Sequence, residues 1–265
     1  MHSATPLPGV TAIVLAGSRP GVDPLLDGSG VSTKALLPVA GRPMLAHVLG
    51  ALVGHGAVGR VVVLAQDIEA LSNDPALAAF VADPAVSFAR SGAGISRSVI
   101  AEIDGGAAFP ILLTTADNVL LTGAMIDAFV FGARGSDIAV GLVERQVLLA
   151  RYPESRRTWL KFRRGWWSGA NLFWIGSEKA RPLLERWHAV EQDRKKGMKI
   201  VGAFGPLLLI GALLRLLTIQ QAVARLGRRL GVNARVVAMP QAEACIDVDK
   251  PSDLTMAEAI LAARA

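Results

Sequence analysis

The chain has 265 residues, with 28 Lys or Arg against 22 Asp or Glu, so its formal net charge is +6 at pH 7. Hydrophobic residues make up 52% and charged residues 19%, a composition that excludes an intrinsically disordered chain. Cys245 is the only cysteine, which excludes a disulfide-stabilised scaffold and suits a reducing compartment. This length is enough for one large domain or two small ones with a sizeable core.

Strand-like and helix-like segments alternate through the first half of the chain. Short apolar or β-branched runs predict strands at residues 10–16, 60–65, 86–90, 110–115 and 138–143. Apolar residues at helical spacing predict helices at residues 43–52, 68–81, 96–103 and 122–131, the last beginning at a Thr cap. Because this alternation is typical of βαβ units, we expect an α/β, Rossmann-like fold: a mostly parallel sheet with helices on both faces.

The second half of the chain is less regular. We expect strands at residues 159–162, 171–175 and 235–238, and helices at 177–196, 201–217, 219–230 and 251–263. No internal repeat or low-complexity linker divides the sequence. We therefore predict a single domain over residues 1–265, with a helical insertion at about 145–232 that caps the sheet.

The sequence predicts a cytoplasmic protein. Residues 1–9 carry no cationic segment of the kind that opens a signal peptide. The longest apolar stretch, residues 207–219, contains Arg215 and is shorter than the ~20 residues that a membrane span needs. The positive charge predicts anionic partners. We expect no nucleic acid among them, because the sequence has no zinc-ligand spacing, no stacking-aromatic signature and no run of five or more basic residues.

The loop after the first predicted strand has the character of a phosphate-binding loop. In open parallel sheets, ligands bind beyond the carboxyl ends of the strands. Small residues at such an end let backbone N–H groups approach a phosphate. The candidate nucleotide-binding residues here are Leu15, Ala16, Gly17 and Ser18. Arg19 and Lys34, on either side of a loop rich in Gly, Pro and Asp, would supply cationic donors.

Two segments of this region, LAGSR (15–19) and KALLPVAGRPML (34–45), resemble the opening of the MobA-like and sugar-phosphate nucleotidyltransferase superfamily. These enzymes open with a strand, a Gly-rich loop carrying an arginine, a lysine, and an L-x-P-V-x-G-x-P-M/L segment that enters the first helix. Ser18 stands where the superfamily usually has a second glycine. The resemblance implies catalytic roles for Arg19 and Lys34 and a fold of the nucleotide-diphospho-sugar transferase type.

The turn after the third predicted strand, residues 90–99 (RSGAGISRSV), is similar to the G-G-x-x-R-x-x-S-V turn of cytidylyltransferases in this superfamily. There the glycines and the serine contact the base and the ribose, which implies nucleotide binding by Gly92 and Ser98. The turn favours CTP as the nucleotide. The next candidate is GTP, as in molybdenum-cofactor enzymes. A plain Gly/Ser turn with Ser96 as a helix cap is the alternative.

Acidic residues in two distant segments predict a magnesium site. Asp117 follows the strand at 110–115, where the superfamily holds Mg²⁺, an ion that prefers hard oxygen ligands. Residues 245–254 (CIDVDKPSDL) resemble the D-x-D-x-P-x-D-L tail of many nucleotidyltransferases. In an extended segment Asp247 and Asp249 would share one face, and two carboxylates there need a cation. We therefore expect Asp117, Asp247 and Asp249 as metal ligands, with Asp117 also contacting the nucleotide.

Basic residues and tryptophans gather in residues 161–171 (KFRRGWWSGAN). In the superfamily a Gly–Asn pair in this region contacts the acceptor, which implies acceptor binding by a small set of side chains. These are Lys161, Arg163, Gly169 and Asn171. A packed hairpin with a solvated basic face explains the same pattern equally well, and both interpretations stay open.

Residues 198–230 form a very apolar run that arginines interrupt. Two amphipathic helices that cover the sheet or form a homodimer contact account for this pattern. A helix that lies on the inner membrane surface, with its arginines toward the lipid headgroups, is the alternative. Both interpretations stay open.

The resemblance implies transfer of a nucleoside monophosphate from an NTP to a phosphorylated small-molecule acceptor, with Mg²⁺ as cofactor and release of pyrophosphate. The acceptor phosphate is already anionic at pH 7, so the reaction needs positioning and charge neutralisation rather than a strong base. Two alternatives from other classes are a nucleotide-sugar-dependent glycosyltransferase and a non-catalytic nucleotide-binding protein.

Overall fold

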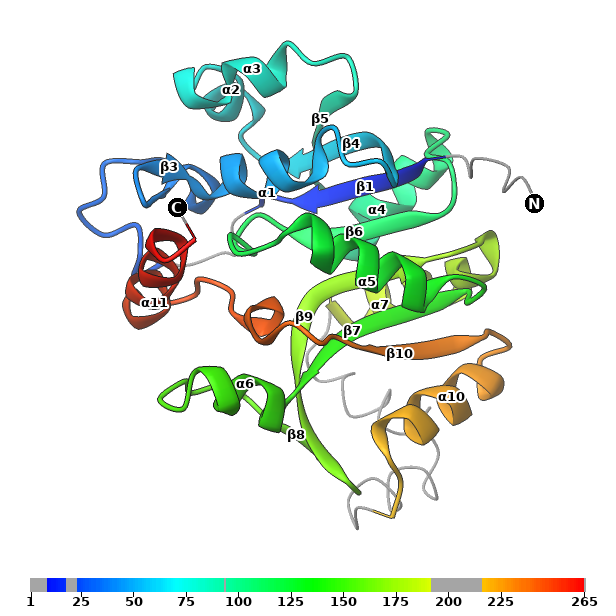
Figure 1. The fold of residues 1–265 in the computed structure, drawn as a ribbon. Helices are drawn as coiled ribbons and strands as arrows, with labels where there is room; N and C mark the ends of the chain where they lie inside the picture. Colours follow the sequence, from blue (N-terminus) through cyan, green and yellow to red (C-terminus); the bar gives the residue numbers. More distant parts are fainter. Residues whose placement is uncertain (1–8, 18–22, 93, 192–215, 265) are drawn as a thin grey trace, which may run out of the picture.

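The computed structural model describes residues 9–17, 23–92, 94–191 and 216–264. Within these residues the chain forms one large sheet flanked by helices (Figure 1). Its strands are β1 (Val10–Leu15), β4 (Val58–Ala65), β5 (Val86–Arg90), β6 (Ile111–Thr115), β7 (Ile138–Glu144), β8 (Leu160–Phe162), β9 (Gly165–Ile175) and β10 (Ala234–Ala238). A separate short hairpin is formed by β2 (Pro38–Val39) and β3 (Arg42–Pro43).

The order of the strands across the large sheet is β10-β7-β9-β6-β1-β4-β5, and β8 pairs with β9. β1 is parallel to both of its neighbours, as are β4 and β5 to each other and β7 and β10 to each other. Only β9 runs against its neighbours β6 and β7 in the part of the chain that the structure describes. The predicted mostly parallel α/β sheet is confirmed, and the parallel strands point their carboxyl ends toward one edge.

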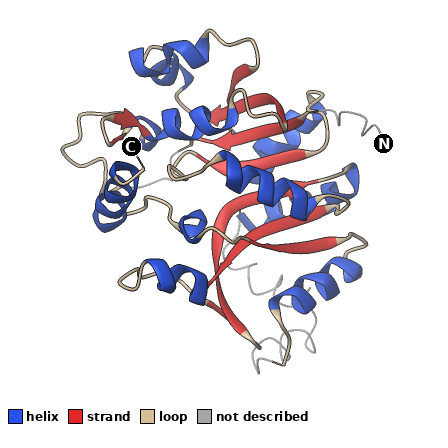
Figure 2. Ribbon diagram, viewed as in Figure 1, coloured by secondary structure: helices blue, strands red, loops and turns tan. Residues whose placement is uncertain are grey.

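Helices lie on both faces of the sheet, as predicted (Figure 2). The described α-helices are α1 (Met44–Leu52), α2 (Ile68–Ser72), α3 (Ala78–Val81), α4 (Ile95–Asp104), α5 (Gly123–Ala133), α6 (Arg145–Arg151), α7 (Arg181–Glu191), α10 (Ile219–Arg229) and α11 (Pro251–Ala262). Side chains alternate across β1, so Ala12 and Val14 pack with α1 and α5 while Ile13 packs with α4 and α7. All three side chains are fully buried.

The prediction of one continuous helix at 68–81 is wrong. The segment forms α2, a short 3₁₀ helix η2 (Pro75–Leu77) and α3 instead. Pro75 has no backbone N–H, so an α-helix cannot continue through it. Asp74 instead caps η2 by accepting a hydrogen bond from the Ala76 N–H. By contrast, α5 begins at the predicted cap, where Thr122 accepts a hydrogen bond from the Met125 N–H.

The region from 145 to 232 contributes to the sheet itself. β9 lies between β6 and β7, in the middle of the strand order. The apolar side of α10, which includes Ile219 and Ala222, is buried and packs on β10 and its neighbours. This agrees with the interpretation in which residues 219–229 cover the sheet, whereas residues 198–215 of the same run lie outside the described residues. The division into one domain with an insertion stays a prediction.

None of the helices that the structure describes is both long enough and apolar enough to cross a bilayer.

Candidate active site

The loops that follow β1, β4 and β5 meet at the carboxyl edge of the sheet. The Ala16 N–H donates to the Leu64 carbonyl, and the Arg90 guanidinium donates to the Gln66 carbonyl. Gly17 packs against the Gln66 side chain so closely that an added Cβ would lie 2.9 Å from its amide nitrogen. Leu15, Ala16 and Gly17 therefore lie where the sequence places a nucleotide-binding loop. Ser18 and Arg19, the other residues predicted in this loop, lie outside the described residues.

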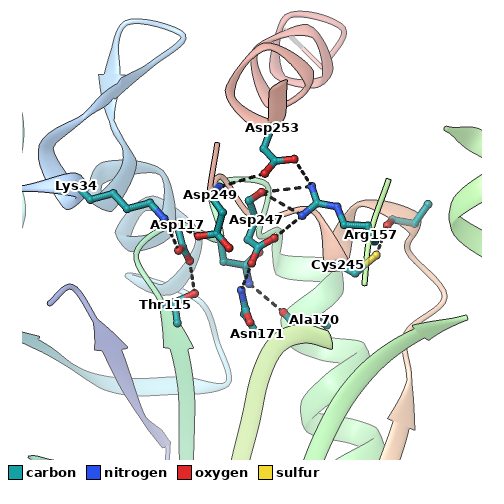
Figure 3. A network of polar contacts seen from close by, with 12 residues as sticks. Lys34, Thr115, Asp117, Arg157, Ala170, Asn171, Cys245, Asp247, Asp249 and Asp253 are labelled. Carbon is teal, nitrogen blue, oxygen red and sulfur yellow. Dashed lines mark hydrogen bonds and ion pairs between the residues drawn. The ribbon is translucent and has the colours of Figure 1, made fainter. Parts of the chain in front are cut away.

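Lys34 joins two acidic residues that are far away in the sequence (Figure 3). It lies in η1 (Lys34–Leu36), and its Nζ is 3.0 Å from Asp117 Oδ2 and 2.7 Å from Asp249 Oδ1. Asp117 follows β6, whereas Asp249 precedes α11. The structure thus brings together the predicted catalytic lysine and two of the three predicted metal ligands.

The two carboxylates hold Lys34 in its charged form. Burial of the lysine side chain disfavours the ammonium, but the charges of Asp117 and Asp249 and their hydrogen bonds outweigh that effect and raise its pKa. Thr115, at the end of β6, fixes the other oxygen of Asp117, since its hydroxyl donates to Oδ1 at 2.5 Å. The geometry of this ion-paired triad is therefore fixed from three separate chain segments.

Asp247 makes different contacts from Asp249, although both carboxylates lie in the same network (Figure 3). Its Oδ1 is paired with the Arg157 guanidinium, and its Oδ2 accepts a hydrogen bond from Asn171 Nδ2 at 2.9 Å. Burial, together with the nearby charges of Asp249 and Asp117, raises the pKa of Asp247 above its ordinary value, against the opposing effect of Arg157. Negative charge is therefore concentrated at this point of the structure.

Arg157 is a site residue that the sequence reasoning missed. Its guanidinium pairs with Asp247 and with Asp253 Oδ1 at 3.1 Å, and only 9% of its side chain is exposed. Asp253 in turn accepts from the Asp249 N–H at 3.3 Å. No motif marks Arg157, because its partners lie 90 and 96 positions away. We refer to these six residues as the carboxylate network: Lys34, Asp117, Arg157, Asp247, Asp249 and Asp253.

The Ser98 side chain stabilises the turn that contains Gly92 and Gly94, between β5 and α4. Its hydroxyl accepts a hydrogen bond from the Gly92 N–H at 2.9 Å and donates one to the Gly94 carbonyl at 2.8 Å. The described helix cap is Gly94 rather than Ser96. Gly92 and Ser98 thus lie together beyond the end of β5, in a turn whose backbone is shaped by the serine side chain.

The predicted acceptor residues fall into two groups. Asn171 contacts the carboxylate network through its hydrogen bond to Asp247. Its backbone has a positive φ of 49°. A non-glycine residue in this region is uncommon and is enriched in Asn. Gly169, two positions earlier on β9, leaves open space where a side chain would lie, because nothing is within 4 Å of an added Cβ.

Lys161 lies in β8 and Arg163 in the turn between β8 and β9, at the end of the hairpin away from Asn171. Lys161 pairs in register with Trp166, and its Nζ is 4.5 Å from the centre of that ring. Trp166 precedes Asn171 by five positions, which at ~3.3 Å per residue in a strand is about 16 Å. The structure thus places Asn171 beside the carboxylate network and records no contact between that network and Lys161 or Arg163 within the described residues.

The donor chemistry of the carboxylate network fits a divalent cation such as Mg²⁺. Magnesium prefers oxygen ligands and is usually held by one or two carboxylates together with substrate phosphates and waters. Asp117 and Asp249 already share one cation, the Lys34 ammonium, and their charges disfavour ionisation of Asp247. Among the described residues no three His, Cys, Asp or Glu side chains form a ready metal cage. A pair of carboxylates completed by substrate phosphates is the arrangement that the residues present support.

Comparisons with known proteins place this chain and its fold among the nucleotidyltransferases, a class of transferase enzymes. The MobA-like NTP transferase domain matches residues 12–199, and the chain belongs to that family. The expected family resemblance is therefore confirmed. No curated protein matches the chain.

Solved structures share the fold over nearly the whole chain. A hypothetical transferase from Thermus thermophilus is 29% identical, with a TM-score of 0.76 over 93% of this chain and 99% of its own. A CMP:2-keto-3-deoxy-manno-octonic acid synthetase in complex with CTP is 14% identical, with a TM-score of 0.59 over 97% of this chain and 100% of its own. The 4-diphosphocytidyl-2C-methyl-D-erythritol synthase of Anaerococcus prevotii is 10% identical, with a TM-score of 0.59 over 96% of each chain.

Proposed function

We propose that this enzyme transfers a nucleoside monophosphate, with CTP as the favoured donor and GTP as the next, to a phosphorylated small-molecule acceptor. The products are the nucleotidylated acceptor and pyrophosphate. The observation that carries this proposal is the meeting of Lys34 with Asp117 and Asp249 at the carboxyl edge of the sheet. The Lys34 ammonium would attract the anionic triphosphate, and the two carboxylates would attract its metal ion. Both lie at the edge where open parallel sheets bind ligands.

The nucleotide and the acceptor would approach the carboxylate network from opposite sides. The loops after β1 and β5, which carry Gly17 and Gly92, would bind the nucleotide. Asn171 and Gly169 of β9 would line the acceptor side together with Asp247. Gly169 supports this placement, because it leaves room beside Asn171 for a ligand. Lys161 and Arg163 would contact only an acceptor long enough to reach the far end of the hairpin.

The chemistry follows from the charges at the site. An oxygen of the acceptor phosphate attacks the α-phosphorus of the NTP, and the bond from that phosphorus to the bridging oxygen of the β-phosphate breaks. The attacking oxygen is already anionic, so no side chain has to remove a proton. The Lys34 ammonium would stabilise the charge that builds on the phosphates. Arg19, outside the described residues, is proposed to do the same.

Mg²⁺, when bound, would act as a Lewis acid that neutralises phosphate charge. Asp117 and Asp249 are the proposed ligands. Asp247, which Arg157 and Asn171 already engage, would take part as a third ligand or hold the acceptor side in place. Contact of residues 198–230 with a membrane surface, a homodimer and a cytoplasmic location stay predictions.

A pyrophosphate-release assay with ATP, CTP, GTP and UTP tests the proposal, using a panel of sugar phosphates and polyol phosphates with and without Mg²⁺. We expect release that requires Mg²⁺ and an acceptor and is fastest with CTP. Consumption of a nucleotide sugar without pyrophosphate release would instead assign a glycosyltransferase. Nucleotide binding without release from any NTP would assign a non-catalytic nucleotide-binding protein.

A further inference from the structure

A pocket of about 340 Å³ lies beside the carboxylate network, between the loop after α6 and the beginning of α11. Asp253 forms part of its wall, and the same side chain accepts hydrogen bonds from Arg157 and from the Asp249 N–H. The pocket therefore shares a wall with the proposed reaction site. The nucleotide transfer described above makes no use of its other lining residues.

Two of the side chains that line the pocket are cations without a partner among the described residues. Arg156 and Lys250 line it, and their side chains have no ion pair or hydrogen bond in the part of the chain that the structure describes. Two acids also line it: Glu154 is exposed, and Asp253 is paired with Arg157, which Asp247 shares. The two cations are therefore available to bind an anion in this pocket.

The beginning of α11 adds donors at the same place. Lys250 occupies the cap position and makes no capping hydrogen bond with its side chain, and Pro251 has no N–H to offer. Ser252, the next residue, lines the pocket and brings a backbone N–H and a hydroxyl. The N–H groups and the dipole at the start of a helix favour a negatively charged ligand there.

Ser155 supplies an observation that does not depend on the helix. It lines the pocket and is only 8% exposed, yet its Oγ has no hydrogen-bond partner within the described residues. Leaving a buried hydroxyl unpaired is unfavourable, and native proteins avoid it unless a ligand or water completes the site. A ligand oxygen in this pocket would satisfy the Ser155 hydroxyl.

We propose that this pocket is a subsite for a phosphate group and that the acceptor substrate carries that group. Hydroxyls, a helix N–H and two cations around one small pocket suit a tetrahedral oxyanion with several acceptor oxygens. The assignment of the phosphate to the acceptor rests on the proposed function, whereas the binding of phosphate does not. The pocket would hold the phosphate of the acceptor next to Asp253, at the edge of the carboxylate network.

Inorganic phosphate is the probe for the binding step, used with the full chain in the absence of nucleotide and Mg²⁺. We expect millimolar phosphate to raise the Tm of the wild type above its value in NaCl at the same ionic strength. The Arg156→Gln/Lys250→Gln double variant should lose at least tenfold in phosphate affinity by calorimetry. Lys179→Gln, a matched change at an exposed lysine in η3 (Glu178–Ala180), should bind as the wild type does.

Ser155→Ala separates binding from folding. Because the hydroxyl is unpaired, its removal should leave the Tm without phosphate unchanged or higher and should reduce the shift that phosphate causes. Wild-type protein that responds to phosphate no more than to chloride overturns the subsite. Equal phosphate affinity in the wild type and the double variant overturns it as well.

Steady-state kinetics then assign the source of the phosphate. We expect the double variant to raise the KM of the phosphorylated acceptor about tenfold and to leave the KM of the NTP within twofold. An unchanged acceptor KM in a variant that has lost phosphate binding overturns the assignment to the acceptor and leaves free phosphate or pyrophosphate as the ligand. If the wild type turns over no acceptor at all, the proposed function fails, while the calorimetry still decides whether the pocket binds phosphate.

Discussion

The ammonium of Lys34 lies 2.7 Å from a carboxylate oxygen of Asp249, a residue 215 positions further along the chain. The same ammonium contacts Asp117, and the pKa of Lys34 is raised as a result, so it stays charged at every pH at which such an enzyme is assayed. Lys34 is therefore the cation that the two carboxylates share. Removing the ammonium would leave Asp117 and Asp249 close together without a neutralising charge.

Lys34→Met should therefore lower kcat on the order of 10²-fold or more, as removal of one preorganised donor does in other enzymes. We expect the far-ultraviolet circular dichroism spectrum to stay that of the wild type. Lys179→Met, at an exposed position in η3, is the control and should retain kcat. A Lys34→Met enzyme with wild-type kcat would remove Lys34 from the mechanism.

Asp117→Asn and Asp249→Asn should each weaken Mg²⁺ binding, because each removes one carboxylate from the proposed pair. The measurement is the Mg²⁺ concentration that gives half-maximal pyrophosphate release, and we expect it to rise about tenfold or more in both variants. Asp127→Asn changes an aspartate whose side chain is 72% exposed and should leave this concentration unchanged. Wild-type Mg²⁺ dependence in both site variants would move the metal elsewhere.

Arg157→Ala should destabilise the protein by about 3–5 kcal/mol, because it leaves the buried Asp253 and the half-buried Asp247 without their cation. Urea unfolding measures this change. Arg181→Ala breaks ion pairs whose acidic partners are exposed, so it should change the urea midpoint little. Arg157→Lys tests geometry, since a lysine retains the charge but cannot donate to both carboxylates as the planar guanidinium does. Equal midpoints for Arg157→Ala and Arg181→Ala would contradict the structural role of Arg157.

Cys245 should be unreactive in the folded protein. Burial raises the pKa of its thiol to about 12 from an ordinary value near 9, so almost no thiolate is present at pH 8. We expect a disulfide reagent such as DTNB to label Cys245 only after unfolding in guanidinium chloride. Fast labelling of the native protein at pH 8 would contradict the burial.

The same shift predicts how stability depends on pH. Between about pH 9 and pH 12 the folded protein retains the thiol proton that the unfolded chain releases, so the contribution of Cys245 to the free energy of unfolding falls as the pH rises through this window. Cys245→Ala removes that contribution. Urea midpoints of the variant should therefore fall less steeply between pH 8.5 and pH 10.5 than those of the wild type.

Replacement by alanine should change the stability of the protein in opposite directions at two helical glycines. A Cβ at Gly227 in α10 would lie 2.6 Å from the Ala234 Cβ and 2.7 Å from the Val232 carbonyl oxygen, so Gly227→Ala should cost about 1–3 kcal/mol. Gly50 in α1 has only a flexible arginine end within 4 Å, and Gly50→Ala should stabilise by about 0.5–1 kcal/mol through helix propensity. Thermal unfolding of both variants measures the contrast. A stabilised Gly227→Ala would mean that α10 does not pack on β10 as described.

Local patterns predicted most of the parallel strands. The apolar runs that became β1, β5 and β6 are short, and turn residues bound them, so the ends predicted from the sequence lie within one residue of those observed. Asp117 was predicted in the site because it directly follows the strand that became β6, and Lys34 because it opens the KALLPVAGRPML segment that resembles the superfamily. The position of β9 was not predictable in this way. An antiparallel strand between β6 and β7 depends on pairing between distant segments, and no local periodicity encodes it.

The sequence by itself determined the alternation of strands and helices, the family of the chain and most of the residues at the carboxyl edge, because each of these depends on neighbouring residues. Only the tertiary structure decided which carboxylate contacts which cation. Asp247 and Asp249 are two positions apart, yet one pairs with Arg157 and the other with Lys34. That choice depends on where the loop after α6 and the loop before α11 come together in space, and hydrophobic packing of the whole sheet fixes that position.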